Sequence, residues 1–419
     1  MKSNFPLYFK LSLMMFFQYM LFAVWWVPLA AYLANMGLSR TLSSLILSSM
    51  AIGCMASPIV GMIADRYFRG QMVLATTNFI VGIMLLAAGM TSNPILLFVF
   101  LLTAMIFYMP SWGLTSSITM KHVDSDIFPR IRVFGAIGWV FAGVFSLFTV
   151  RYLNMDFDGT HIPFFYAAGI AIVAGLFNLS LPDTPPLGKG QKASLIDIMG
   201  FRSFKLMKDH NFKVFIIISF LAMIPFSMYW SYFSEFLADS GFEFISLTIN
   251  MGPLLEMFIL LTVPISIKRF GLRRTMIFGL LALIVRYATL IFGEGEMQLP
   301  MIMIAVLVHG FIFGYFYLGG QIYIDRKAPA SLRAQGQGFI FFITFGVGLL
   351  LGNFISGEII RFFSVESGGG LVYQWNYIWG VTTLLSVLCA LGFILFFKKE
   401  DYSTIELEEI KANEEVDAA

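Results

Sequence analysis

The chain has 419 residues, of which 58% are hydrophobic and only 12% are charged. A soluble globular domain typically carries about twice that share of charged residues. The composition therefore excludes an ordinary soluble protein and predicts a polytopic membrane protein. The net charge of +2 gives no support for nucleic-acid binding. Because Cys54 and Cys389 both lie in apolar runs, we expect neither disulfides nor a metal site, and no cofactor.

Apolar runs long enough to cross a bilayer follow one another along the chain, and they predict twelve transmembrane helices. They cover residues 8–34, 41–64, 71–92, 94–118, 131–154, 162–181, 213–238, 246–267, 274–292, 299–325, 333–361 and 372–397. One long polar connection separates the sixth run from the seventh. We therefore predict an all-α membrane protein with a six-helix bundle over 1–181, a cytoplasmic linker over 182–212, a second bundle over 213–397 and a disordered cytoplasmic tail over 398–419.

The basic residues predict how the chain is oriented. With the N-terminus in the cytoplasm, only Arg40, Arg151 and Arg361 of the 27 Lys and Arg residues lie outside, and Arg286 lies within the ninth span. Lys and Arg are enriched in cytoplasmic loops of membrane proteins. Both termini are therefore expected in the cytoplasm.

The two halves also resemble each other at matching positions. The segment GMIADRYFRG (61–70) follows the second span, and IKRFGLRR (267–274) follows the eighth. Arg132 lies near the start of the fifth span, and Arg333 near the start of the eleventh. Internal repeats of this kind are common in secondary transporters.

One carboxylate, Glu256, lies near the centre of the eighth predicted span. A charge at that depth costs roughly 2.5–3.5 kcal/mol on insertion scales, so such residues usually face a cavity and serve a function. We expect Glu256 to face a watery cavity as the proton site, with Arg132 as its partner. The alternatives are a purely structural ion pair for Glu256, and for Arg132 a side chain that reaches the membrane surface.

Two further polar residues lie within predicted spans. His309 lies early in the tenth span and is a second candidate for proton handling, because histidine titrates near neutral pH. A packed histidine without such a role is the alternative. Arg286 is expected to be structural and bonded to exposed backbone carbonyls. The paired aromatic residues Trp25–Trp26 and Tyr229–Trp230 suit either packing or stacking on a ligand.

The segment 61–70 resembles the loop signature of the major facilitator superfamily, and this resemblance implies a gating motif of Gly61, Asp65, Arg66 and Arg69. A more specific resemblance extends over nearly the whole chain. The segments that carry it are similar to the bacterial nucleoside:proton symporter family: FYMPSWGL (107–114), FPRIRVFGAIG (128–138), GPLLE (252–256), KRFG (268–271), HG (309–310) and QIYIDRKAP (321–329).

The resemblance implies a twelve-helix facilitator fold in a bacterial inner (plasma) membrane, with nucleosides taken up together with protons. It places Arg132 and Glu256 at the positions of the family's binding-site arginine and acid. It implies further substrate contacts from aromatic or polar side chains at Trp139, Ser227, Trp230, His309 and Phe313. The chain departs from the family pattern at Ala136, Pro253 and Gly314, where the family carries a threonine, a glutamine and an aspartate.

Several alternatives stay open. Fewer amides mean fewer hydrogen bonds to a base, so the cargo could be another small polar solute such as a sugar, carried with or without protons. A non-transporting sensor and a membrane-embedded enzyme are further possibilities. The sequence has no metal-ligand spacing, phosphate-binding loop or nucleophile triad, so we do not expect an enzyme. The expected partners are the solute, protons and the bilayer, and the expected state is a monomer.

Overall fold

The computed structural model describes residues 5–124, 127–186, 199–293, 295–329, 332–367 and 370–400. The first half of the chain forms helices with these bounds: α1 (Phe5–Trp26), α2 (Leu29–Asn35), α3 (Arg40–Leu47), α4 (Ser49–Tyr67), α5 (Gly70–Met90), α6 (Pro94–Tyr108), α7 (Pro110–His122), α8 (Phe128–Leu153) and α9 (Ile162–Asn178).

The second half begins with the short 3₁₀ helix η1 (Phe201–Lys208), followed by α11 (His210–Asp239), α12 (Ile245–Asn250), α13 (Gly252–Phe270) and α14 (Leu272–Ile291). The 3₁₀ turn η2 (Gly295–Met297) leads into α15 (Gln298–Leu307), α16 (His309–Phe311), the π-helical segment η3 (Ile312–Leu318) and α17 (Gly319–Lys327). The chain continues through α18 (Arg333–Phe341), the π-helical segment η5 (Phe342–Gly348), α19 (Leu349–Phe362), strands β1 (Ser364–Ser367) and β2 (Gly370–Tyr373), and α20 (Trp375–Phe396).

The predicted spans agree with these helices. Within the described residues, 11 helical stretches are long and apolar enough to cross a membrane, and α9 is an apolar helix just below that length. The all-helical membrane fold is therefore confirmed. The antiparallel pair β1–β2, in which Ser364 faces Tyr373, is an addition that the hydrophobic pattern did not predict.

Polar residues at the helix starts explain several boundaries. The Asn93 side chain accepts hydrogen bonds from the backbone N–H groups of Ile95 and Leu96 at the start of α6. The Asp209 carboxylate accepts one from Phe212 at the start of α11, at 2.8 Å. Such caps satisfy N–H groups that have no partner within the helix. These two helices therefore begin where a capping residue meets an apolar run.

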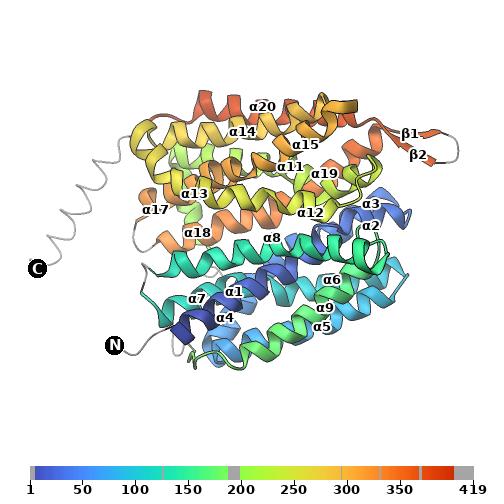
Figure 1. Cartoon of the computed structure of the whole chain (residues 1–419). Helices are drawn as coiled ribbons and strands as arrows, with labels where there is room; N and C mark the ends of the chain where they lie inside the picture. The colour runs from blue at the N-terminus through green and yellow to red at the C-terminus, as the bar shows by residue number, and fades with distance from the viewer. Residues whose placement is uncertain are drawn as a thin grey trace, which may run out of the picture.

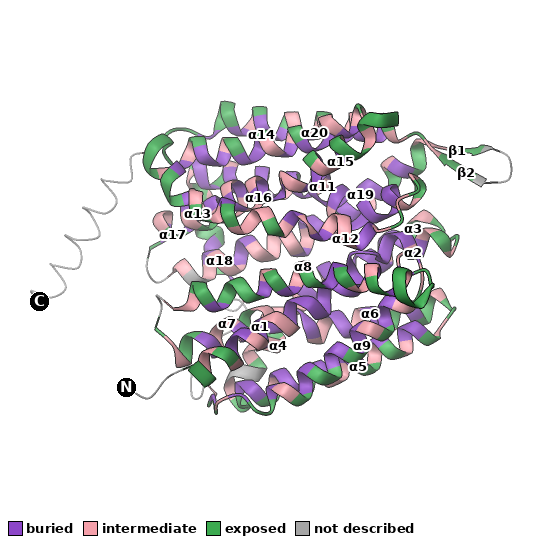
Figure 2. Ribbon diagram, viewed as in Figure 1, coloured by how far each residue is buried: buried purple, intermediate pink, exposed green. Residues whose placement is uncertain are grey.

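The helices of the two halves occupy different parts of the molecule (Figure 1). Most of the first half lies in the lower part of the view and the second half in the upper part, and both termini lie at the left end. Exposed residues follow the outer faces of α5, α9, α14 and α20 (Figure 2), and many of them are large and apolar, including Leu86, Val173, Leu281 and Leu388. Those faces are suited to contact with lipid.

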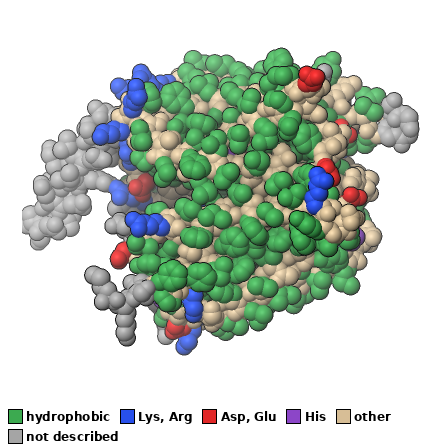
Figure 3. Space-filling model, viewed as in Figure 1, with side chains coloured by type: hydrophobic (Ala, Val, Ile, Leu, Met, Phe, Trp, Pro, Cys, Tyr) green, Lys and Arg blue, Asp and Glu red, His purple; other side chains and the backbone are tan. Residues whose placement is uncertain are grey.

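Lys and Arg side chains gather mostly at the end that carries both termini (Figure 3). The enrichment of Lys and Arg in cytoplasmic loops predicts that this end faces the cytoplasm. Residues 187–198 of the predicted linker and 401–419 of the predicted tail lie outside the described residues. The described linker contains η1, and the start of the tail is bonded to α11, because Asn211 accepts a hydrogen bond from the Lys398 backbone N–H at 2.8 Å.

At the opposite end, polar contacts join the two halves. Arg40 at the start of α3 donates two hydrogen bonds of 2.7 Å to Glu235 on α11. Asp158, in the loop before α9, accepts hydrogen bonds from Ser146 on α8 and from the backbone N–H and hydroxyl of Ser246 on α12. Burial raises the pKa of the Asp158 carboxyl, and these hydrogen bonds oppose the shift. Both acids therefore connect the halves on the side away from the termini.

Candidate functional site

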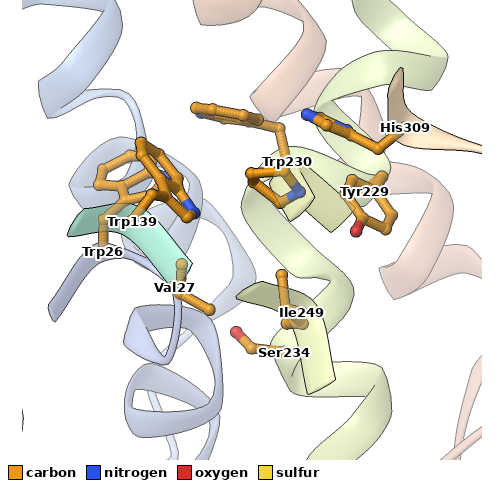
Figure 4. A pocket seen from close by; sticks show the side chains of 9 residues that line it. Trp26, Val27, Trp139, Tyr229, Trp230, Ser234, Ile249 and His309 are labelled. Atoms are coloured by element: carbon orange, nitrogen blue, oxygen red, sulfur yellow. The ribbon is translucent and has the colours of Figure 1, made fainter. Parts of the chain in front are cut away.

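A cavity of ≈ 130 Å³ lies between the two halves. Its lining residues come from both halves: Tyr19, Trp112, Arg132, Ala136, Trp139, Trp230, Pro253, Glu256, His309 and Phe313. A smaller cavity of ≈ 30 Å³ shares Trp139, Trp230, Pro253 and His309 with the first. In Figure 4, Trp26 and Trp139 lie on one side of this smaller cavity, and Tyr229 and His309 on the other. The structure thus brings together six of the seven predicted substrate contacts.

Glu256 lies in the second turn of α13, and its side chain is 23% exposed. The close approach of α13 to α16 sets its position, because a Cβ atom at Gly310 would lie 2.6 Å from the Glu256 Cα. Only glycine at 310 permits this packing. As a result the carboxylate oxygen Oε2 lies 3.6 Å from the His309 Nε2 atom. The carboxyl group therefore faces the cavity with an imidazole as its neighbour.

Arg132 lines the same cavity from the start of α8. Its guanidinium carbon lies 4.4 Å from the centroid of the Tyr19 ring, a cation–π contact. Tyr19 in turn stacks on Trp112, with ring planes 11° apart. Sequence reasoning missed both aromatic residues as cavity residues. Trp112 lies within the family-like segment 107–114 and could have been found there, whereas nothing local distinguishes Tyr19 from its apolar neighbours.

Arg132→Lys is expected to lower uptake almost as strongly as Arg132→Ala. A planar guanidinium can donate two parallel hydrogen bonds while it lies on the Tyr19 ring, and an ammonium cannot reproduce that geometry. Hydrogen bonds to charged groups contribute about 1.5–3 kcal/mol, which corresponds to a loss of about 10- to 100-fold. Initial rates of uptake in proteoliposomes test this, with Arg130→Lys as the control, because Arg130 lies in the same helix and does not line the cavity. Wild-type rates for Arg132→Lys would contradict it.

Aromatic rings dominate the cavity wall. Trp139 of α8 and Trp230 of α11 come from opposite halves, and their ring centroids are 5.9 Å apart. Trp230 is also nearly parallel to His309, with planes 16° apart. Phe313 is supplied by η3, and π-helical segments occur frequently at functional sites. These faces suit a flat ring stacked between the halves.

A buried arginine, Arg286, contacts the ring nitrogen of His309 that does not face Glu256. Arg286 of α14 is 0% exposed, and its Nη2 atom donates to His309 Nδ1 at 3.0 Å. Its Nε atom donates to the Ala305 carbonyl at 3.0 Å, as expected for an arginine bonded to backbone. Its guanidinium carbon lies 3.8 Å from the centroid of the Tyr229 ring. The contact with His309 was not predicted, because it depends on how α14 packs against α16.

The remaining predicted residues lie elsewhere. Ser227 is fully buried between α11 and α19, where its hydroxyl donates to the Ile224 carbonyl and pairs with Ser356 at 2.9 Å. It lines neither of these cavities, so we do not carry it into the proposed site. Gly314 also faces away from them, because a Cβ atom there would contact Val263 on α13. An acid at this position would meet an apolar helix face in this arrangement.

The predicted gating motif lies at the end that carries the termini. Gly61 lines a separate cavity of ≈ 420 Å³ between α4, α5 and α7. Arg69 forms an exposed ion pair with Asp183 at 3.2 Å, a contact within the first half. Arg66 lies in the last turn of α4. The side chain of Asp65 lies outside the described part of the structure, so a gating role for the motif stays a prediction.

Comparison with known proteins identifies the family of the chain. The family model described as "Nucleoside H+ symporter" matches residues 5–402. YegT of Escherichia coli, provisionally named a nucleoside transporter, is 33% identical over 94% of each chain. The nucleoside permease NupG of Escherichia coli is 25% identical over 93% of this chain and 95% of its own.

Solved structures show the same fold. The crystal structure of the nucleoside transporter NupG superposes with a TM-score of 0.83 and 24% identity, covering 94% of this chain and all of the other. The inward-open xylose transporter XylE from E. coli superposes with a TM-score of 0.69 and 14% identity, over 96% of this chain and 99% of its own. The chain therefore belongs to the nucleoside H+ symporter family and is a multi-pass transporter of the major facilitator fold, not an enzyme.

Proposed function

We propose that this protein imports nucleosides together with protons across a bacterial plasma membrane by alternating access, as a monomer. One observation carries the proposal: a carboxyl group, Glu256, and a guanidinium group, Arg132, come from opposite halves and line one aromatic cavity. A solute bound between them contacts both halves at once. Its binding free energy can therefore favour one arrangement of the halves over another.

The cavity wall offers complementary groups for a nucleoside. Trp139, Trp230 and Phe313 offer ring faces, and a nucleobase stacked on an aromatic side chain gains about 1–3 kcal/mol. Arg132 supplies donors only, whereas ionised Glu256 supplies acceptors only. Ribose hydroxyls can both donate and accept, so they can bond to both residues. Family membership supports this substrate class.

The proton is assigned to Glu256. A carboxylate that remains ionised while the cavity closes is costly, because water no longer solvates the charge. Protonation removes this cost, so the cavity closes on a bound solute most readily when Glu256 also carries a proton. The solute and the proton would thus each alter the free energy of closing the same cavity. That shared dependence is what coupled transport requires.

Another small polar solute, such as a sugar, is the second candidate. Ala136 and Pro253 line the cavity where the family resemblance implies a threonine and a glutamine. The wall therefore has fewer side chains than the family pattern that can form hydrogen bonds with the edge of a base. A site with few such groups discriminates poorly between bases. The aromatic walls favour the nucleoside over the sugar.

Uptake into proteoliposomes tests the proposal directly. We expect labelled uridine and adenosine to accumulate when the outside is made more acidic than the inside, and a protonophore to abolish the accumulation. Labelled xylose is the matched solute without a base. Accumulation of xylose but not of either nucleoside would support the second candidate. Nucleoside uptake that is indifferent to both the gradient and the protonophore would refute proton coupling.

A further inference from the structure

We propose that Arg286 is a positioning residue of the transport site, which keeps His309 neutral with its single ring proton on Nε2, directed at Glu256. His309 would then carry one fixed N–H group that faces Glu256, and the coupling proton would belong to Glu256 alone. The consequence for transport rests on the proposed function. The protonation state of the ring does not, because it follows from contacts within the protein.

Arg286 and His309 are in direct contact. Arg286 Nη2 lies 3.0 Å from His309 Nδ1, and both residues are buried. A guanidinium group has N–H donors only, and it stays protonated in proteins. A hydrogen bond at this distance therefore requires a lone pair on Nδ1. A neutral imidazole with a lone pair on Nδ1 carries its proton on Nε2.

A second proton on the ring is opposed by the same contact. The second proton would sit on Nδ1. The N–H group of a charged imidazole would then face the Nη2 N–H group of the guanidinium at 3.0 Å, and neither could accept a hydrogen bond. Like charges this close, shielded from water, disfavour the charged form of the histidine. Glu256 Oε2 would favour the charged ring, but it lies farther away, at 3.6 Å from Nε2. Burial of the ring disfavours the charged form most, and the closer contact with Arg286 acts in the same direction.

The other groups packed around His309 do not change this balance. Tyr229 of α11 presents its ring to the histidine, with centroids 5.8 Å apart, and presents the same ring to Arg286. Trp230, also of α11, lies nearly parallel to the imidazole. Arg132 of α8, which lines the same cavity, adds a second positive charge. Glu256 of α13 is thus the one acid that faces the ring from the described helices packed around it.

The remaining contacts hold the guanidinium in place. Nε is bonded to the Ala305 carbonyl, and the face of the group lies on Tyr229. Nη1 has no hydrogen-bond partner among the described residues. No acid contacts the guanidinium in the described part of the chain, so an apolar side chain of similar length removes a buried charge and leaves no opposite charge unpaired. Arg286→Met is therefore expected to fold.

Nitrogen NMR of the membrane-reconstituted protein, labelled with ¹⁵N-histidine, tests the assignment. The chain has four histidines, so His309 is identified by the signal missing in His309→Gln. In the wild type we expect Nε2 protonated and Nδ1 unprotonated from about pH 5 to pH 8. In Arg286→Met we expect the same ring to titrate within that range. The other three histidines report whether the variant is folded.

Uptake measured against pH provides the functional readout. Arg286→Met should add a second ionisation to the profile, and the double variant Arg286→Met/His309→Gln should lose it again. A proton on Nδ1, a wild-type ring that titrates in this range, or an Arg286→Met spectrum identical to the wild type would overturn the proposal. If the NMR result is as expected while nucleosides are not transported, the proposed function fails and the assignment of the ring stands.

Discussion

Glu256→Gln is expected to abolish uphill, proton-driven accumulation of nucleoside while exchange of nucleoside across the membrane continues. Glutamine has nearly the shape of a protonated glutamate and cannot release a proton. The variant would therefore behave like a carrier fixed in the protonated state. Such a carrier can still bind solute and alternate, but a pH gradient has no group through which to act.

Two assays on the same proteoliposomes separate these properties. Accumulation is measured under an imposed pH gradient, and counterflow is measured with unlabelled nucleoside inside and no gradient. Glu366→Gln is the matched control, because Glu366 is an exposed acid on β1, in the hairpin between α19 and α20. Full accumulation by Glu256→Gln would refute the assignment of the proton. Loss of counterflow together with accumulation would assign Glu256 to solute binding instead.

Glu235→Gln is expected to open the end of the molecule that lies away from the termini. Arg40 and Glu235 join α3 to α11 through two hydrogen bonds of 2.7 Å, and their side chains are only 11% and 3% exposed. Removing one partner of a buried ion pair leaves the other charge uncompensated, at a cost of about 3–5 kcal/mol. Separation of the two halves lets water reach Arg40 and removes that cost. The closed arrangement should therefore lose population by a factor of about 100 or more.

Spin labels on opposite halves measure this opening. Met90→Cys at the end of α5 and Tyr377→Cys at the start of α20 offer exposed sites, and the native Cys54 and Cys389 are buried. We expect a longer and broader distance distribution in Glu235→Gln, and recovery in the charge swap Arg40→Glu/Glu235→Arg. The control is Glu358→Gln, which breaks an exposed pair with Arg361 on one helix. An unchanged distribution in Glu235→Gln would contradict the prediction.

Much of the architecture was predictable because it depends on local pattern. A run of about 20 apolar residues can satisfy its backbone in a membrane only as a helix, so the spans follow from composition and length. Caps such as Asn93 and Asp209 mark helix starts for the same local reason. Two short elements were not predictable in this way. The hairpin β1–β2 and the π-helical segment η3, which supplies Phe313, leave no signal in the hydrophobic pattern.

The site was predictable only in part. Glu256 was identified because an acid within a span is costly, and Arg132 because of a family resemblance; in the structure both line one cavity. Tyr19 and Trp112 escaped notice, because aromatic residues in apolar helices usually serve packing. Ser227 was placed at the site from an aligned position, but the packing of α19 against α11 turns its hydroxyl toward Ser356.

The sequence by itself determined what each segment must be, since hydrophobic length, charge placement and capping act over a few neighbouring residues. Only the tertiary structure decided which side chains meet. Arg286 with His309, Arg40 with Glu235, and Arg132 with Tyr19 are contacts between different helices, made by helix packing. Such contacts depend on the crossing and rotation of whole helices, and close approaches such as that of Gly310 to Glu256 determine how near those helices lie.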